Sequence, residues 1–178
     1  MNNDICEIVA DEAALEKKVA EIAAEINRDY DGKVPVVVGI LKGSVIFYAD
    51  LIRKLNMNCE LDFMAVSSYG SSTVSSGVIK IKKDISADVT NRDVLVVEDI
   101  LDTGNTLYLL KDYLLEKGAK SVRLCTLFDK PERRQKPVKP DYKGFVIDDL
   151  FIVGYGLDYN EKYRNLPYVG VLKKEVYS

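Results

Sequence analysis

Three carboxylates stand where an apolar segment of the chain ends. Residues 94–106 read VLVVEDILDTGNT, so Glu98, Asp99 and Asp102 interrupt a run of aliphatic side chains, and small hydrogen-bonding residues follow. Carboxylates can accept a proton, accept hydrogen bonds from sugar hydroxyls, or hold a hard cation such as Mg²⁺ through oxygen. We therefore expect this segment to carry the chemistry of the protein.

The residues directly after these acids indicate a phosphate-binding turn. Thr103, Gly104, Asn105 and Thr106 lie where an expected strand passes into an expected helix. A helix N-terminus offers unpaired backbone N–H groups and the positive end of a dipole, and glycine lets a ligand approach the backbone closely. The two threonine hydroxyls add donors. Acidic residues beside such a turn would repel a phosphate unless they had separate roles.

A purely structural interpretation competes with this one. In it, Asp102 only caps the following helix, and Glu98 and Asp99 are solvated charges at a strand end. The complete pattern of acids, glycine and threonines favours the functional interpretation. Two other phosphate-binding motifs are excluded, because residues 39–44 lack the GxxxxGK[ST] spacing and no dinucleotide-binding fingerprint is present.

Composition narrows the chemistry further. The chain contains no histidine, which excludes Ser-His-Asp and Cys-His catalysis and removes the commonest zinc ligand. Acid–base chemistry then falls to a carboxylate, a lysine or a tyrosine. Cys6, Cys59 and Cys125 are far apart and form no CxxC pair, so we expect reduced thiols.

Size and charge indicate a compact intracellular protein. With 178 residues and 47% hydrophobic content, the chain is expected to form a single domain over residues 1–178 with its own core. The net charge of -3 does not favour a general nucleic-acid or membrane binder. The first residues do not resemble a leader, and no apolar run is long enough to span a bilayer. We therefore expect a cytoplasmic location.

The elements that must position these residues alternate along the chain. Continuous Val/Ile/Leu runs alternating with helical patterns predict an α/β protein whose parallel sheet is covered on both faces. The expected strands are residues 34–40, 59–68, 94–100 and 121–128, with a hairpin arm at 78–84 and short apolar pieces at 150–155 and 166–172. The expected helices begin after Asp11, run from about residue 45 to Leu55, and cover 106–117, and a Lys/Pro-rich connector spans 130–143.

Such a sheet places the candidate residues together. In open α/β sheets ligands bind outside the carboxyl ends of the strands. This rule puts Lys42, Gly43, the three acids, Lys130 and the residues after Phe151 along one rim.

The sequence resembles the type I phosphoribosyltransferases. Their phosphoribosyl pyrophosphate loop has two acids, two mostly apolar residues and Asp-Thr-Gly-x-Thr after an apolar strand, as residues 94–106 do. The segments ILKGSVIF, SSYGSST, FDKPERR and FIVGYGLDYNEKYRNLPYVGVL narrow the resemblance to the bacterial hypoxanthine phosphoribosyltransferases, in the family's order along the chain. The resemblance implies a central parallel sheet flanked by helices, a small hood region and a mobile lid hairpin.

The resemblance also implies a role for each matched acid. Asp102 resembles the residue that accepts the proton from N7 of the purine. Glu98 and Asp99 match the acids that bind the ribose hydroxyls and Mg²⁺, and Asp158 matches a carboxylate that serves a second Mg²⁺. Thr103, Gly104, Asn105 and Thr106 match the loop that binds the 5′-phosphate, although many relatives carry a basic or apolar residue in place of Asn105.

The cations and the hood residues receive roles in the same way. Lys42 and Gly43 match a pyrophosphate-binding turn, which in the family often has a cis peptide before the lysine, and Arg164 matches a pyrophosphate clamp. Lys130 resembles the donor to the 6-oxo oxygen of the base. Phe151 resembles the aromatic residue that stacks on the purine, and Ile152 resembles the residue whose backbone reads the far edge of the base. Ser68 and Tyr69 match the start of the lid.

The implied activity is purine salvage. It is the Mg²⁺-dependent transfer of phosphoribosyl from phosphoribosyl pyrophosphate to hypoxanthine or guanine, giving IMP or GMP and pyrophosphate. A xanthine-preferring enzyme and a regulator of transcription or RNA that binds phosphoribosyl pyrophosphate remain as alternatives. The resemblance implies a homodimer or homotetramer, and the charge balance predicts no nucleic-acid or membrane partner. The roles of Arg133 and Arg134 stay open, because each could anchor a loop or contact another subunit.

Overall fold

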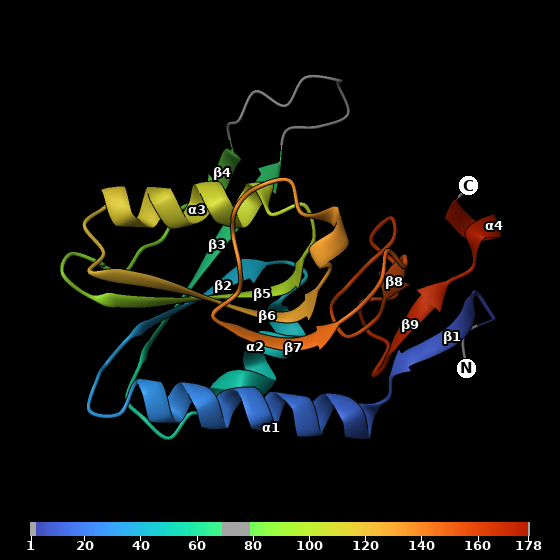
Figure 1. Ribbon diagram of the computed structural model, residues 1–178, viewed down its shortest axis with the longest axis horizontal. Coiled ribbons are helices and arrows are strands. Elements are labelled where there is room, and N and C mark those ends of the chain that lie inside the picture. Colours follow the sequence, from blue (N-terminus) through green and yellow to red (C-terminus); the bar gives the residue numbers. More distant parts are fainter. Residues whose placement is uncertain (1–2, 69–78, 178) are drawn as a thin grey trace.

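A computed structural model describes residues 3–68 and 79–177 and arranges them around two sheets (Figure 1). The larger sheet has six described strands in the order β4-β3-β2-β5-β6-β7. Their bounds are β2 Val36–Leu41, β3 Glu60–Ser68, β4 Ile79–Lys83, β5 Asp93–Leu101, β6 Ser121–Asp129 and β7 Tyr142–Val146.

The larger sheet is mixed. Strands β3, β2, β5, β6 and β7 pair in parallel, whereas β4 pairs with β3 in the antiparallel direction. The expectation of a parallel sheet is therefore correct for the centre and needs correction at one edge, where β4 returns beside β3 as the predicted hairpin arm. The expected lid falls mostly on residues 69–78, which lie outside the described residues, so the lid stays a prediction.

Helices cover both faces of this sheet. Helix α1 (Glu12–Asp29) and helix α2 (Val45–Ile52) lie on one face, and α3 (Asn105–Glu116) lies on the other (Figure 1). Asp11 is the N-cap of α1, as predicted, because its side chain accepts a hydrogen bond of 2.8 Å from the backbone N–H of Ala14. The apolar stripe of α1 is buried as its spacing predicts, through Leu15, Val19, Ile22 and Ile26.

Helix α2 ends earlier than the sequence suggests. It was expected to continue to Leu55 but ends at Ile52. The side chain of Asn27 on α1 donates to the backbone carbonyl of Lys54 at 3.0 Å and accepts from the backbone N–H of Asn56 at 2.7 Å. These bonds satisfy backbone groups outside a helix, so the chain can leave α2 at that point.

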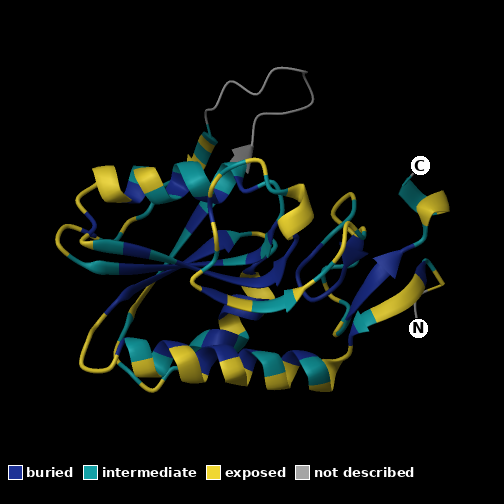
Figure 2. Cartoon of the chain, viewed as in Figure 1, coloured by how far each residue is buried: buried dark blue, intermediate teal, exposed yellow. Residues whose placement is uncertain are grey.

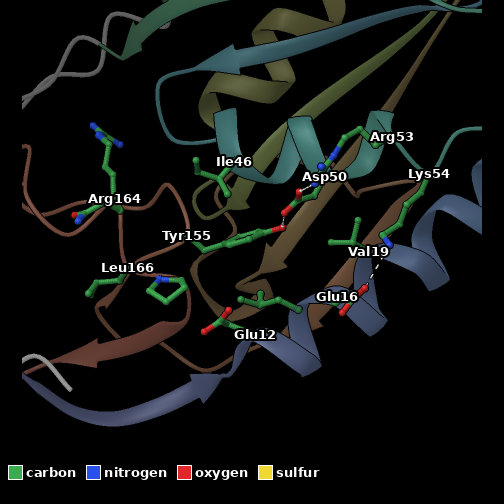
Figure 3. Close-up of a pocket in the computed structure, with 13 residues that line it drawn as sticks. Glu12, Glu16, Val19, Ile46, Asp50, Arg53, Lys54, Tyr155, Arg164 and Leu166 are labelled. Atoms are coloured by element: carbon green, nitrogen blue, oxygen red, sulfur yellow. Dashed lines mark hydrogen bonds and ion pairs between the residues drawn. The ribbon is translucent and has the colours of Figure 1, made fainter.

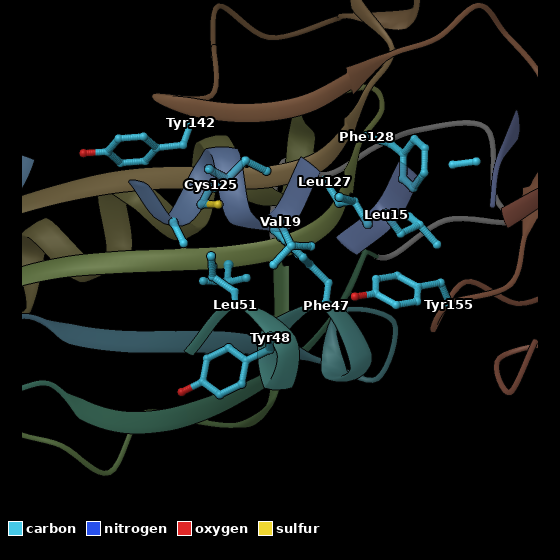
Figure 4. Packing of buried hydrophobic residues seen from close by; sticks show 14 of the residues in the cluster. Leu15, Val19, Phe47, Tyr48, Leu51, Cys125, Leu127, Phe128, Tyr142 and Tyr155 are labelled. Atoms are coloured by element: carbon cyan, nitrogen blue, oxygen red, sulfur yellow. The ribbon is translucent and has the colours of Figure 1, made fainter. Parts of the chain in front are cut away.

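The core of the larger sheet consists of two layers, one on each face, and its central strands are buried (Figure 2). Along β5, Leu95 and Val97 face the layer beneath α1 and α2, and Val94 and Val96 face the layer beneath α3. Figure 4 shows the first layer, where Val19 of α1 and Leu51 and Phe47 of α2 pack together. Burial on both faces explains why the central strands read as continuous aliphatic runs.

A smaller sheet lies beside the carboxyl edge of the larger one (Figure 1). It has the described order β1-β9-β8, with β1 Ile5–Ala10, β8 Ile152–Val153 and β9 Val169–Leu172, and is followed by helix α4, Lys174–Tyr177. This sheet corresponds to the expected hood. Strand β1 was missed, because IVA is its one apolar run and exposed or partly exposed residues make up most of it. The structure also corrects the connector, whose end forms edge strand β7.

None of the described helices combines the length and apolar character needed to cross a bilayer. The three cysteines are free, with Cys6 exposed, Cys59 half-buried and Cys125 buried.

Candidate active site

The carboxyl ends of β2 and β5 open into a pocket of about 490 Å³. Nine residues predicted for the site line it: Gly43, Glu98, Asp99, Asp102, Thr103, Gly104, Thr106, Asp158 and Arg164. The parallel pairing of β2 with β5 brings the first of these together, because both strands end at the same edge. Asp158 and Arg164, from the segment after β8, complete the lining, so residues more than a hundred positions apart meet in this pocket.

Glu98 and Asp99 form an acidic pair inside this pocket. Burial and the neighbouring Asp99 carboxylate raise the pKa of Glu98 well above its usual range, and burial also raises the pKa of Asp99. The Asp99 carboxylate lies against Gly43, where an added Cβ would come within 1.8 Å of Oδ2. Glycine at 43 therefore permits the close contact between the turn after β2 and the end of β5.

The turn after β5 has the geometry expected of a phosphate loop. The N-cap of α3 is Gly104, with φ of 83°, and no side chain caps this helix. A side chain at 104 would be strained at this φ and would clash with Val138, whose Cγ1 lies 2.6 Å from an added Cβ. The carbonyl of Thr103 accepts hydrogen bonds from the backbone N–H groups of Gln135 and Lys136, which anchors the loop from outside.

The side chain of Asn105 points elsewhere. Its amide donates to Gln135 Oε1 at 3.2 Å, and the residue does not line the pocket. Only its backbone, as the first residue of α3, remains available for the predicted phosphate loop.

Asp102 is not a helix cap, so the purely structural interpretation of this residue is wrong. Its Oδ1 atom is buried and lacks a well-aligned hydrogen-bond donor, although Arg133 Nε lies 2.8 Å away as an ion-pair partner. The side chain as a whole is 39% exposed. Since Oδ1 is inaccessible, the exposed part of the carboxyl group is its other oxygen.

Arg134 anchors the loop that follows β6. Its Nη1 donates to the backbone carbonyl of Asp102 at 2.7 Å, and its Nη2 pairs with the buried Asp129 carboxylate. Of the two interpretations left open for this residue, the loop anchor is confirmed.

Lys130 leaves β6 beside Asp102. Leu101 and Asp129 are paired neighbours on β5 and β6, and the backbone N–H of Lys130 donates to Leu101 O at 2.9 Å. The Lys130 side chain is buried at 8% exposure of the residue, and its Nζ donates to Leu150 O at 2.6 Å. Lys130 does not line the 490 Å³ pocket, so its predicted role at the base stays a prediction.

Phe151 and Ile152 belong to the hood. Phe151 is 37% exposed and stacks on Tyr177 with ring centroids 4.6 Å apart, while Tyr159 meets its edge at 5.7 Å. Ile152 is buried and pairs with Val171 in the small sheet.

The cations predicted for pyrophosphate meet at one carboxylate. Lys42 Nζ lies 3.0 Å from Glu161 Oε1, and Arg164 Nη2 lies 3.3 Å from Glu161 Oε2. Arg164 Nη2 also pairs with Asp158 at 2.8 Å. The Leu41–Lys42 peptide is cis, as the resemblance suggested.

The lid residues are only partly described. Ser68 ends β3, with its backbone opposite Ile79 of β4, and Tyr69 lies outside the described residues.

A second pocket of about 390 Å³ lies between α1, α2 and the segment 164–167 (Figure 3). It shares Arg164 with the first pocket, and Tyr155 donates to Asp50 there at 2.5 Å. Glu12, Glu16, Arg53 and Lys54 give it mixed charge. The acidic pair and the phosphate loop lie elsewhere, so this pocket is not the candidate active site.

Sequence reasoning did not predict an ion pair beside Asp102. Arg133 was left ambiguous and Asp149 was not considered, yet Arg133 Nη1 lies 3.1 and 3.0 Å from the two carboxylate oxygens of Asp149. The sequence offers one signal, two consecutive aspartates at 148–149 just before Leu150 and Phe151, and it identifies no partner for them.

The fold and the site are those of a phosphoribosyltransferase. Residues 7–160 match the family model described as phosphoribosyl transferase domain. At 50% identity, the chain aligns over its full length with 99% of the hypoxanthine-guanine phosphoribosyltransferase of Streptococcus pneumoniae. The chain belongs to the hypoxanthine-guanine phosphoribosyltransferase family.

Two further comparisons place it within that family. The full chain is 52% identical to part of the bifunctional protein TilS/HprT of Listeria monocytogenes and spans 28% of that relative's length. A crystal structure of a hypoxanthine phosphoribosyltransferase from Staphylococcus aureus superimposes with a TM-score of 0.96 at 47% identity, covering 100% of this chain and 97% of that one.

Proposed function

We propose that this protein transfers the phosphoribosyl group of phosphoribosyl pyrophosphate to hypoxanthine or guanine and releases pyrophosphate. The observation that supports this most strongly is one pocket that joins a phosphate loop, an acidic pair and the exposed carboxyl oxygen of Asp102. The sugar phosphate occupies the loop from Thr103 to Thr106, where the N-terminus of α3 supplies backbone N–H groups. The ribose hydroxyls donate to Glu98 and Asp99.

In the proposed reaction, Asp102 accepts a proton from the purine base. The purine N9 forms a bond to C1 of the sugar as the bond from C1 to pyrophosphate breaks, and the bonding electrons leave with the pyrophosphate. The ring becomes cationic, which makes N7–H acidic, so a carboxylate can take that proton. The exposed oxygen of Asp102 is free to receive it, because Arg133 contacts the other one.

The remaining residues orient the base and the leaving group. The Lys130 ammonium donates to the 6-oxo oxygen of the purine, and the ring of Phe151 supports the base. Lys42 and Arg164 exchange the Glu161 carboxylate for pyrophosphate oxygens. Arg164 offers a planar pair of donors to that group.

The acids of the pocket fit Mg²⁺. Glu98 and Asp99 are adjacent carboxylates whose charges disfavour each other, and a divalent cation relieves that repulsion. No three acids in the described part of the chain converge on one point, so substrate oxygens and water would complete the coordination. Glu98 and Asp99 would hold one ion and Asp158 would serve a second. When bound, Mg²⁺ neutralises charge on the departing pyrophosphate.

Several wider properties stand as proposals. We propose a single domain over residues 1–178, a cytoplasmic location and a homodimer or homotetramer. We also propose a lid that begins at Ser68 and Tyr69 and excludes water during transfer.

One experiment tests the proposed activity. The protein is mixed with phosphoribosyl pyrophosphate and Mg²⁺, each of adenine, hypoxanthine, guanine and xanthine is offered, and pyrophosphate release is measured. We expect release with hypoxanthine and guanine. Preference for xanthine would replace the substrate assignment, and binding of phosphoribosyl pyrophosphate without release for any base would indicate a regulator.

A further inference from the structure

A chain of charged side chains connects the two groups that face the purine in the proposed function. Arg133 Nε lies 2.8 Å from Asp102 Oδ1, and Arg133 Nη1 lies 3.1 and 3.0 Å from the oxygens of Asp149. Asp149 Oδ1 in turn lies 3.6 Å from Lys130 Nζ. The order along the chain is therefore Asp102, Arg133, Asp149, Lys130.

These contacts contribute little to stability. The side chains of Arg133 and Asp149 are 43% and 52% exposed, and ion pairs between exposed groups stabilise a fold weakly. Their geometry is nevertheless specific, since one guanidinium touches two carboxylates that come from different segments. Because these ion pairs add little to stability and one of them contacts Asp102, we look for their role in the site.

The purine explains why the two ends of the chain need a fixed separation. N7 and the 6-oxo oxygen lie side by side on one edge of a 6-oxopurine. A protein that reads this edge needs an acceptor for N7–H beside a donor for the oxygen, and Asp102 and Lys130 supply that pair. Both leave adjacent strands at the same level, but strand pairing fixes the backbone and not the side-chain torsions. Lys130 Nζ has one further contact, to Leu150 O at 2.6 Å, which does not involve Asp102.

Arg133 also selects which oxygen of Asp102 is available. It contacts the buried Oδ1 and leaves the exposed side of the carboxyl group unoccupied. Asp149 holds the other end of the guanidinium, and the two acids together raise the pKa of Arg133, so its charge is constant over the working pH range.

We propose that Arg133 and Asp149 are positioning residues that hold Asp102 and Lys130 at the spacing of the N7 and 6-oxo edge of the purine. This inference rests on the proposed function and deepens it. Neither residue touches substrate in this scheme. Their loss should affect the placement of the base and not the binding of the sugar phosphate. Among the described interactions, neither Arg133 nor Asp149 contacts the phosphate loop or the acidic pair of Glu98 and Asp99.

The test is a cycle of variants measured with hypoxanthine and with guanine. Arg133→Ala and Asp149→Asn should each lower kcat/KM for the base by about 10–100-fold, since small errors in the placement of reacting groups are costly. The fall should be equal for the two bases, which share the same edge. The affinity for phosphoribosyl pyrophosphate should stay within about threefold of wild type.

The double variant distinguishes a chain from two separate effects. Because each residue acts through the other, Arg133→Ala with Asp149→Asn should be no worse than the more impaired single variant. Independent effects that multiply would overturn the inference. Arg133→Lys keeps the charge but has one nitrogen in place of the separate Nε and Nη1 that contact Asp102 and Asp149, so we expect it to recover less than half of the lost kcat/KM.

Controls separate this inference from the proposed function. Arg92→Ala removes a comparable arginine ion pair, to Glu60, at the opposite end of the sheet and should leave kcat/KM unchanged. If wild-type protein releases no pyrophosphate with either base, the proposed function is wrong. If wild type is active and both single variants stay within threefold of it, the positioning role is wrong. Should Arg133→Ala fail to fold, Asp149→Asn decides alone.

Discussion

At the scale of single residues, Asp102 carries the most direct prediction. We expect Asp102→Asn to lower kcat by about 10²–10⁴ while phosphoribosyl pyrophosphate binds nearly as well, because an amide cannot take the N7 proton. Loss of a helix cap cannot explain such a result, since Gly104 and not Asp102 caps α3. Steady-state pyrophosphate release and equilibrium binding measure the two quantities. Turnover within about threefold of wild type would remove Asp102 from the proton transfer.

Lys130 carries the prediction of base selectivity. Adenine presents an amino group where hypoxanthine presents a carbonyl, and an ammonium has donors only, so the buried Lys130 would face a second donor in place of an acceptor. We expect adenine to be disfavoured by about 10⁴–10⁵ in kcat/KM. Lys130→Gln, whose amide donates and accepts, should depress the reaction with hypoxanthine and narrow this gap. Wild-type protein that uses adenine as well as hypoxanthine would contradict the role of Lys130.

At the scale of elements, Asp62 joins β3 to the segment after β4. Its Oδ2 accepts from the backbone N–H groups of Ser86 and Ala87 at 2.6 and 2.8 Å, and its Oδ1 accepts from Lys83 Nζ at 3.2 Å. Asp62→Asn turns one acceptor into a donor that faces other donors. We expect the free energy of unfolding at pH 7 to fall by about 1–3 kcal/mol, measured by urea denaturation.

The same substitution should have a defined pH dependence. Burial by itself raises the pKa of Asp62, but the amides of Ala87, Phe63 and Ser86 outweigh it and lower the pKa. A carboxylate with a depressed folded-state pKa stabilises fully above its unfolded value of about 3.9 and less as pH falls through the folded value. The difference between wild type and Asp62→Asn should therefore shrink below about pH 4. Asp31→Asn, in a turn without such bonds among the described residues, should show no difference at either pH.

At the scale of the whole molecule, the ligand should stabilise the protein in a metal-dependent way. The proposed site takes residues from β2, β5 and the segment 154–164, so a bound ligand ties the large sheet to the region of the hood. With phosphoribosyl pyrophosphate at about 100 times its Kd and Mg²⁺ present, stabilisation should reach about 2.7 kcal/mol, seen as a rise in Tm. Chelation of Mg²⁺ should remove most of this rise. An equal rise with and without chelator would contradict the role given to Glu98 and Asp99.

Much of the fold could be predicted from the sequence, because its signals are local. The stripe of α1 and the continuous runs of β2, β5 and β6 report burial on one side or on both, and periodicity makes that burial visible in neighbouring residues. The phosphate loop is likewise local, since its acids, glycine and threonines are consecutive. The family resemblance then assigned roles to residues such as Lys130 and Arg164 that composition alone leaves ambiguous.

Tertiary structure decided the features that depend on distant partners. Helix α2 stops where Asn27 of α1 binds its following backbone, and the small sheet joins β1 from one end of the described chain to β9 near the other. Arg133 meets Asp102 and Asp149 because parallel pairing of β6 with β5 and with β7 brings the segments after these strands to one rim. Each of these contacts links residues far apart in sequence, and no local pattern of hydrophobicity or spacing encodes which partner a side chain will reach once the sheet is assembled.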